Sequence, residues 1–301
     1  MKSYLEATAR ERIAQVVDAG TFREIVAPTA REVSPHLPVL GLPVAFDDGV
    51  VAGSAMLDGL GVEIAAQEGG FMGGAVGEVH GAKLVGALSR ALRKKSRGVV
   101  LLLESGGVRL QEANAGLIAV SEVIRAILDV RASGIPVVAA IGGSFGCFGG
   151  MGIAAACCTA IVMSEESRLG LSGPEVIETV RGVEEFDSRD RALVWRTTGG
   201  KHRYLTGDCT TLVDDAIASF RSAIARALRA GEDFSLDAVA REHRLLRARI
   251  ARYGDCGDGA DIWREMGFGD ATKLSLMSAA ELTALAEEAS RASSVMAEEA
   301  R

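Results

Sequence analysis

The chain has 301 residues, of which 48% are hydrophobic and 24% are charged, the balance of a soluble globular protein with a sizeable core. Its formal net charge of −7 argues against nucleic acid or an anionic membrane as the main partner. Glycine is abundant at 36 residues while aromatic residues make up only 5%, which favours close backbone packing over an aromatic-lined groove.

The first third of the chain predicts a helix, a loop, a hairpin and a second helix. Residues 3–19 have amphipathic helical spacing, and their charges, where an export signal would be apolar, favour a cytoplasmic protein. Residues 28–48 hold four of the six prolines and predict an extended surface loop. The runs 50–57 and 62–67 flank "DGLG" and predict a hairpin. Residues 69–96 are a glycine-rich loop followed by a helix.

Strands and helices alternate in the middle of the chain. An apolar strand at 98–104 precedes a glycine loop and a helix over about 110–132. A second strand at 135–141 precedes another glycine loop and a helix from about 149, and a third strand follows at 159–163. This order predicts right-handed βαβ units and a sheet of parallel character.

The uncharged segment 135–163 is long enough to cross a membrane. Its six glycines fall in two groups, however, and no cluster of Lys and Arg brackets it. Strands that are covered on both faces by helices also appear as continuous apolar runs. We therefore expect strand, turn, helix and strand here, and no membrane partner.

The last third of the chain is predicted to be mostly helical. The expected helices are 187–196, 211–230, 236–252 and 278–300. We expect one α/β domain over residues 1–301 with a helical extension over about 187–301. The five cysteines form neither a CxxC pair nor a Cys/His array with zinc spacing, so we expect reduced core thiols and no metal site.

Glycine pairs follow two of the predicted strands, in "SGGVRL" (105–110) and "GGSFGCFGGM" (142–151). If the two loops are neighbours, one backbone N–H from each could point at a single oxygen and form an oxyanion hole. The alternative is that both are only tight turns. Phosphate or dinucleotide binding is a weaker interpretation, because GxxxxGK[ST] and the third glycine of the dinucleotide motif are absent.

The stretch "GGSFG" (142–146) also matches the Gly-x-Ser-x-Gly pattern of hydrolases, with Ser144 as the nucleophile. Such an enzyme needs a histidine and an acid later in the chain. Only His202 and His243 follow in order, and both lie in basic sequence that we expect to be exposed. The hydrolase is therefore a separate and weaker hypothesis.

Other polar residues near the glycine loops have a structural and a functional interpretation. His80 could donate a proton, although packing on a helix is the commoner role of such a residue. Glu104 and Glu112 are expected to be solvated or salt-bridged. Arg109 could bind a carboxylate, but by default it anchors its own helix.

Basic clusters occur at 89–97, 199–204 and 241–253. Such clusters usually form a solvated helix face. The alternative is a docking patch for an acidic partner or for ligand phosphates.

Several long stretches resemble the N-terminal half of biotin-dependent carboxyltransferases, which belong to the crotonase-like group. They are "ARERIAQVVDAGTFREI" (9–25), "FMGGAVGEVHGAKL" (71–84), "ESGGVRLQE" (104–112) and "LSGPEVIETVRG" (171–182). The closer resemblance covers nearly the whole chain and is to the beta subunits of biotin-independent malonate decarboxylases. It is carried by "GGSFGCFGGMGIAAACC" (142–158) and "TTGGKHRYLTGDCTTLVDDAI" (197–217).

The resemblance implies a fold and a reaction. The fold is α/β, a crotonase-like spiral of ββα units with helical N- and C-terminal segments, which stabilises thioester enolates with paired backbone N–H groups. In the family, malonate is carried as a thioester on the CoA-like arm of an acyl-carrier subunit, and no cofactor is covalently bound. The beta subunit and a gamma partner release CO2 and leave an acetyl thioester.

The resemblance also implies roles for particular residues. One oxyanion donor falls at the backbone of Gly107 or Val108, and the other at Gly149 or Gly150. The proton donor to the enolate is either His80 or Tyr204, or a group of the gamma subunit. The expected substrate-binding residues are Gly73, Gly74, Gly106, Arg109, Gly173 and Pro174.

The chain departs from some carboxyltransferases in three respects. It lacks the four-cysteine zinc ribbon of bacterial acetyl-CoA carboxylase beta chains, and it has no biotin-attachment site. It also matches only about half of a carboxyltransferase unit, which implies a second chain. Two alternatives stay open: a carboxyltransferase subunit that passes the carboxylate to biotin, and a non-catalytic scaffold.

Overall fold

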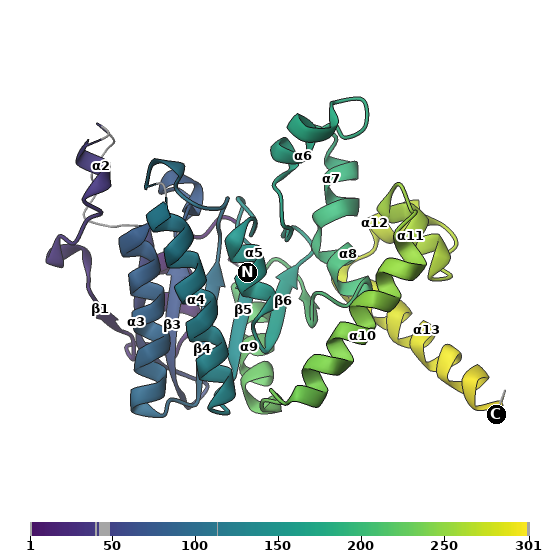
Figure 1. The fold of residues 1–301 in the computed structure, drawn as a ribbon. Helices are drawn as coiled ribbons and strands as arrows, with labels where there is room; N and C mark the ends of the chain where they lie inside the picture. The colour runs from purple at the N-terminus through teal and green to yellow at the C-terminus, as the bar shows by residue number, and fades with distance from the viewer. Residues whose placement is uncertain (1, 40, 42–48, 113, 300–301) are drawn as a thin grey trace.

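The computed structural model describes residues 2–39, 41, 49–112 and 114–299. Within them, one mixed sheet has its strands in sequence order, and the sheet is antiparallel from β1 to β3 and parallel from β3 to β7 (Figure 1). The strands are β1 (Arg23–Ile25), β2 (Val50–Leu57), β3 (Leu60–Gln67), β4 (Gly98–Leu103), β5 (Val137–Ile141), β6 (Ala160–Ser164) and β7 (Thr211–Val213). This arrangement confirms the predicted α/β class.

Helices cover both faces of the sheet and extend beyond it at the C-terminal end (Figure 1). The α-helices are α1 (Ala9–Val16), α2 (His36–Val39), α3 (Glu78–Lys94), α4 (Asn114–Ala132), α5 (Gly150–Ala156), α6 (Pro174–Arg181), α7 (Arg191–Thr198), α8 (Gly200–Leu205), α9 (Ile217–Ala230), α10 (Leu236–Tyr253), α11 (Gly259–Glu265), α12 (Ala271–Leu276) and α13 (Ala279–Glu299). Short 3-10 turns are η1 (Pro28–Ala30), η2 (Met72–Gly74) and η3 (Leu110–Glu112).

The core lies in two layers because successive side chains of a strand point to opposite faces. In β4, Leu101 packs with α3, α4 and α5 on one face, and Leu102 packs with α1 and α9 on the other. All six residues of β4 are buried. This explains why the strand appears as a continuous apolar run in the sequence.

The predicted hairpin is confirmed, with a tighter turn than expected. Leu57 pairs with Leu60, so only Asp58 and Gly59 form the turn. Both have positive φ, 51° and 77°, as a two-residue hairpin turn with the right-handed twist of the strands requires.

The predicted first helix, 3–19, is shorter in the structure. Thr8 caps α1 through a capping box with Glu11, and the helix ends at Val16. The predicted loop 28–48 contains η1 and α2, while its residues 40 and 42–48 lie outside the described part.

The prediction of a helix over 211–230 is wrong for its first residues. Thr211–Val213 forms β7 beside β6, and α9 begins only at Ile217. A short apolar run of this kind does not distinguish a buried strand from a helix. Both β7 and α9 contribute to the sheet core, although they lie within the segment predicted as a helical extension.

The apolar segment 135–163 forms β5, the second glycine loop, α5 and β6, as predicted. No helix in the described ranges has the length and apolar character needed to cross a membrane.

Candidate active site

The two glycine loops lie side by side at the C-terminal ends of β4 and β5. The Ser105 N–H donates to the Gly146 carbonyl at 2.8 Å, and the Phe148 N–H donates to the Ser105 carbonyl at 2.8 Å. A Cβ atom placed on Gly149 would lie 3.1 Å from the Gly107 Cα. The two loops are therefore neighbours, which is the condition for one backbone N–H from each to donate a hydrogen bond to the same oxygen.

Two of the four N–H groups implicated by the sequence are already engaged. The Gly107 N–H is 3.2 Å from the Ser105 hydroxyl oxygen, which accepts its hydrogen bond. The Gly149 N–H donates to the Leu171 carbonyl at 2.9 Å. These bonds hold the loops in shape and leave the two neighbouring N–H groups for other acceptors.

The N–H groups of Val108 and Gly150 have no hydrogen-bond partner among the described residues. The next N–H after Val108, that of Arg109, donates to the Val76 carbonyl at 3.0 Å. Successive N–H groups of an extended segment point to opposite sides, so that of Val108 points away from Val76. Gly150 is the first residue of α5, where an N–H has no acceptor within the helix.

A third glycine segment, which includes Gly73 and Gly74, packs against the first loop. The Gly106 N–H donates to the Gly73 carbonyl at 2.8 Å. Gly74 has a φ of +68°, and a Cβ there would lie 1.9 Å from the Glu104 carbonyl oxygen. Only glycine fits at such a position, because any side chain would displace the end of β4.

A buried ion pair joins α1 to both loops. Arg12 is 1% exposed and Glu104 is 3% exposed, and the Arg12 Nη1 contacts the Glu104 Oε2. The other carboxylate oxygen accepts a hydrogen bond from the Phe145 N–H at 3.1 Å. Glu104 therefore links the end of β4 to the second loop, in a salt-bridged role as expected.

Arg109 supports the first loop from inside the protein. Its side chain is 1% exposed, its Nε donates to the Ala75 carbonyl at 2.9 Å, and its Nη1 is 3.3 Å from the Glu112 carboxylate. Glu112 in turn accepts a hydrogen bond from the Glu78 N–H at 2.6 Å, at the start of α3. The contacts thus fit an anchoring role for Arg109.

The two predicted proton donors lie in different surroundings. His80 is fully buried, with its Nε2 3.0 Å from the Gln67 amide nitrogen and its Nδ1 3.4 Å from Arg109. Tyr204 lies on α8 and packs between the sheet core and a cluster around Trp263. Partial burial raises the pKa of its hydroxyl. The source of the proton stays a prediction.

The predicted residues Gly173 and Pro174 start α6, with proline in the first turn where its missing N–H costs no helical hydrogen bond. The segment just before them borders the second loop, since the Leu171 carbonyl accepts the Gly149 N–H. These residues therefore belong to the surroundings of the paired loops.

Ser144 lacks the partner that a hydrolase needs. Its hydroxyl is 3.3 Å from the Glu104 carboxylate, and within the described residues no hydrogen bond joins it to a histidine. The expectation that His202 is exposed is wrong: it is buried on α8, with its ring centroid 6.1 Å from that of Trp263, and burial lowers its pKa to about 4. His243 lies on α10.

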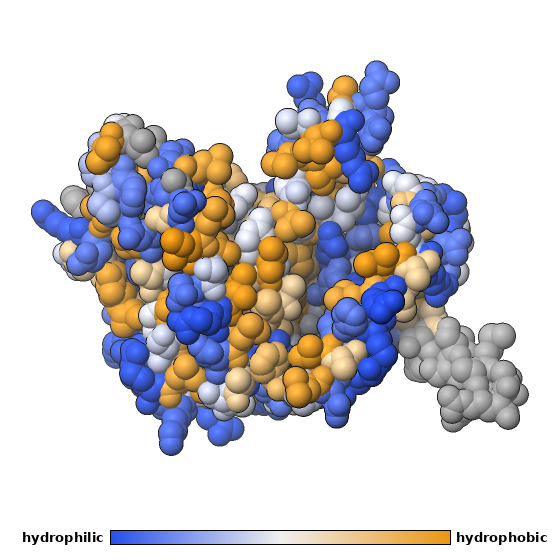
Figure 2. All heavy atoms as spheres, viewed as in Figure 1, coloured by the Kyte–Doolittle hydropathy of each residue, from blue (hydrophilic) through white to orange (hydrophobic). Residues whose placement is uncertain are grey.

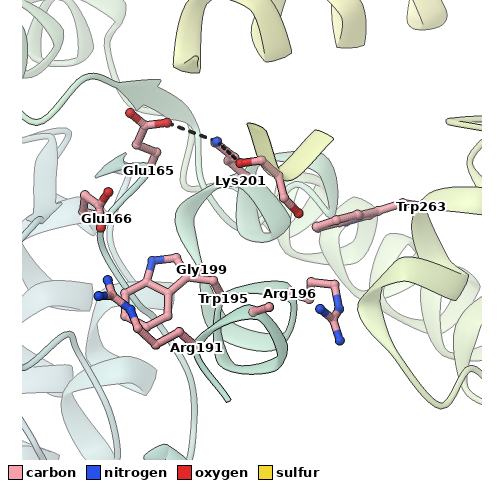
Figure 3. A pocket seen from close by; sticks show the side chains of 10 residues that line it. Glu165, Glu166, Arg191, Trp195, Arg196, Gly199, Lys201 and Trp263 are labelled. Carbon is pink, nitrogen blue, oxygen red and sulfur yellow. Dashed lines mark hydrogen bonds and ion pairs between the residues drawn. The ribbon is translucent and has the colours of Figure 1, made fainter. Parts of the chain in front are cut away.

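A cavity of about 230 Å³ lies between the β6–α6 loop and the helices α7, α8, α11 and α12 (Figure 3). It is lined by both tryptophans of the chain, Trp195 and Trp263. Lys201 on its wall is 3.1 Å from Glu165, and Arg196 is paired with an aspartate outside it at 2.8 Å. The paired glycine loops do not line this cavity, so we place the candidate active site at the loops.

Exposed apolar side chains surround the paired loops, and we call them the loop surface. They come from η3, α4, α5 and the segment before α6: Leu110 (83% exposed), Leu117 (58%), Ile118 (62%), Ile153 (47%) and Leu171 (70%). Figure 2 shows apolar atoms gathered over α4, α5 and α6 on the face of the molecule that carries these elements. Such a surface on a folded chain is typical of a contact with another protein.

The family model of the carboxyl transferase domain matches residues 6–215. The chain belongs to this family. It is 43% identical over 288 residues to the malonyl-S-ACP:biotin-protein carboxyltransferase of Malonomonas rubra, covering 88% of this chain and 90% of that protein. It is also 34% identical over 191 residues to the acetyl-coenzyme A carboxylase carboxyl transferase subunit beta of Fusobacterium nucleatum, covering 59% of this chain and 60% of that one.

Solved structures of carboxyl transferase proteins show the same fold. One chain of a Pseudomonas malonate decarboxylase hetero-tetramer, crystallised with malonate, matches with a TM-score of 0.79 and 40% identity, over 88% of this chain and 97% of that one. A chain of the Pseudomonas malonate decarboxylase hetero-dimer matches with a TM-score of 0.66 and 38% identity, over 82% and 96%. The predicted crotonase-like α/β fold is therefore confirmed.

Proposed function

We propose that the chain is the beta subunit of a biotin-independent malonate decarboxylase of the cytoplasm. With a gamma partner, it decarboxylates a malonyl thioester on an acyl-carrier subunit to an acetyl thioester. The observation that carries the proposal is the pair of unpartnered N–H groups, Val108 and Gly150, on two adjacent loops. The likeness to a malonyl-S-ACP carboxyltransferase and to malonate decarboxylase chains supports the substrate class.

The reaction places its charge where these donors can act. The bond between the carboxylate carbon and the α-carbon breaks, CO2 leaves, and the electron pair moves onto the thioester oxygen as an enolate. The N–H groups of Val108 and Gly150 donate to that oxygen. One such donor lowers a barrier by roughly 3–4 kcal/mol. The α-carbon then takes a proton from His80, Tyr204 or a gamma-subunit group and becomes the methyl group of the acetyl thioester.

The surrounding glycines let the thioester approach the backbone. In the proposal, Gly73, Gly74 and Gly106 shape one wall beside the substrate, and Gly173 and Pro174 border the other. Arg109 holds the first wall from inside. The CoA-like arm of the carrier presents the thioester, so the chain needs no covalently bound cofactor of its own.

The second candidate function is transfer of the malonyl carboxylate to biotin. It is favoured by the 43% identity to the Malonomonas rubra carboxyltransferase, whose name includes a biotin protein. The same two N–H groups would stabilise the same enolate. The two functions differ only in whether the released carboxyl group is captured by biotin.

One assay separates these functions. Purified chain, gamma partner and malonyl-carrier thioester are mixed, and CO2 release is measured with and without a biotinylated protein. We expect release without biotin. Strict dependence on biotin would assign the transfer reaction, and an intact complex with no turnover would assign a scaffold.

The Ser144 hydrolase hypothesis has its own test. Because the Ser144 hydroxyl contacts Glu104 rather than a histidine, we expect Ser144→Ala to retain thioester turnover. Complete loss of activity in a folded Ser144→Ala protein would support the hydrolase instead.

A further inference from the structure

Helix α10 is exposed along its whole length. It has 18 residues, and none of those described in it is buried. Five large apolar side chains of α10 are exposed: Leu236 (88%), Val239 (52%), Leu245 (47%), Leu246 (43%) and Ile250 (73%). All of them except Leu245 share one face of the helix, because they are spaced by three, seven and four residues. An exposed apolar face on a helix indicates a contact with another molecule, because helices are stabilised mainly by packing their apolar face.

The same helix is strongly basic in an acidic chain. The whole chain has a formal net charge of −7. Helix α10 contains two acidic residues, Asp237 and Glu242. It contains five arginines, which are Arg241, Arg244, Arg247, Arg249 and Arg252. The partner of this helix should therefore present negative charge.

Two of these arginines are available at the edge of the apolar face. Arg249 is tied to Asp208 at 2.7 Å, and Arg241 is paired with an acid just before the helix. Arg244 and Arg247 have no acidic partner in the part of the chain that the structure describes. Arg247 follows Leu236 by about three helical turns, so it lies beside the apolar face, and Arg244 is one turn away from it.

The loop surface and α10 differ in the kind of contact they suit. The loop surface is defined by apolar residues, which fits a permanent partner such as a gamma subunit. In Figure 2, apolar and hydrophilic atoms alternate along α10. A smaller apolar stripe with a charged border fits a transient partner that is steered by charge and leaves after each turnover.

We propose that α10 is the docking surface for the acyl-carrier subunit, and that the carrier meets it with acidic side chains beside an apolar stripe. The proposal rests on the proposed function, because that function supplies the carrier. The carrier's apolar stripe packs on Leu246 and Ile250, and its acids pair with Arg244 and Arg247.

Contacts connect this surface to the candidate active site. Arg249 ties α10 to Asp208, which follows α8. At the start of α8, the Gly200 N–H donates to the Ser167 carbonyl at 3.0 Å, and the next carbonyl accepts the Cys147 N–H of the second glycine loop at 2.9 Å. These contacts link α10 through α8 to the second glycine loop.

The test uses the assembled complex of the chain with its gamma partner and the double variant Arg244→Glu/Arg247→Glu. The dissociation constant of the purified acyl-carrier subunit is measured by biolayer interferometry, and kinetics are followed with malonyl-carrier and with malonyl-CoA. We expect the dissociation constant and the KM for malonyl-carrier to rise about tenfold. The kcat and the KM for malonyl-CoA should not change.

The matched control is Arg93→Glu/Arg97→Glu, which makes the same charge change at exposed positions beside the N-terminal end of β4. It should leave carrier binding unchanged. Raising the ionic strength should weaken carrier binding to the unmodified complex more than binding to the α10 variant.

Three results would overturn the proposal. Unchanged carrier affinity in the α10 variant means that the carrier docks elsewhere. Loss of the gamma partner in size-exclusion chromatography assigns α10 to that subunit, and a changed number of chains per complex assigns it to a second copy. Carrier binding is read without turnover, so a complex that binds the carrier through α10 but releases no CO2 would contradict only the proposed function.

Discussion

The paired glycine loops and α10 are held in opposite ways. The loops are fixed by backbone hydrogen bonds and by two buried ion pairs, Arg12–Glu104 and Arg109–Glu112. Helix α10 has no buried residue in the described structure, and its C-terminal half is tied to Asp208 by Arg249. Stabilising a developing charge requires donors that are already in place, whereas a docking helix can adjust to its partner. The predictions below test this contrast.

Arg12→Ala should have the largest effect. It leaves Glu104 buried without its cation, which should lower the free energy of unfolding by about 3–5 kcal/mol. Chemical denaturation measures the loss. The matched control is Arg10→Ala on the same helix, where the pair with Glu24 is partly exposed, and it should cost less than about 1 kcal/mol. Equal losses for the two variants would contradict the importance of the buried pair.

Replacing the Gly150 peptide N–H by an ester oxygen should reduce kcat about 100- to 1000-fold. This change removes the unpartnered donor without adding a side chain, which would clash at 2.5 Å with Val120. The kinetics of malonyl-thioester turnover measure the effect. The same replacement at Gly149 removes a hydrogen bond to Leu171 and should affect kcat less. A larger loss of kcat for the Gly149 ester than for the Gly150 ester would contradict the assignment of the donor to Gly150.

His202 should make the stability of the α8 region depend on pH. Burial lowers its pKa from 6.5 to about 4, so between these values the unfolded chain binds a proton that the folded chain does not. The contribution of neutral His202 to the free energy of unfolding is then fully present above about pH 6.5 and is lost as the pH drops toward 4. Denaturation at pH 7 and pH 4.5 should show a loss of about 2–3 kcal/mol that His202→Phe removes. An equal loss in His202→Phe would assign it to other groups.

Arg249→Ala should have the smallest effect on overall stability. The pair with Asp208 is partly exposed, so the free energy of unfolding should fall by about 1 kcal/mol or less. Hydrogen exchange should speed up in α10 and stay unchanged in β4 and β5, because opening of α10 need not disturb the sheet. Faster exchange throughout the sheet would show that α10 is part of the core.

Much of the fold could be predicted because its signals are local. The strand that became β4 is an apolar run bounded by glycine, and "DGLG" indicated the hairpin turn. The glycine pairs marked both loops, and the parallel order of the central strands put the two loops at one edge of the sheet. The short run Thr211–Val213 carried no such signal, because three residues show no period.

The candidate site depended more on contacts between distant residues. The glycine pattern located the two loops, and the family resemblance implied four backbone groups in them, but neither distinguished Val108 and Gly150 from Gly107 and Gly149. That distinction comes from acceptors such as the Leu171 carbonyl, which only the folded chain brings close.

By itself, the amino-acid sequence determined the class of fold, the position of both glycine loops and the basic character of α10, because composition and periodicity are properties of neighbouring residues. The tertiary structure decided which N–H groups lack a partner, that Arg12 lies against Glu104, and that the apolar face of α10 is uncovered. These depend on pairings between segments far apart in the chain, and burial changes the energy of each.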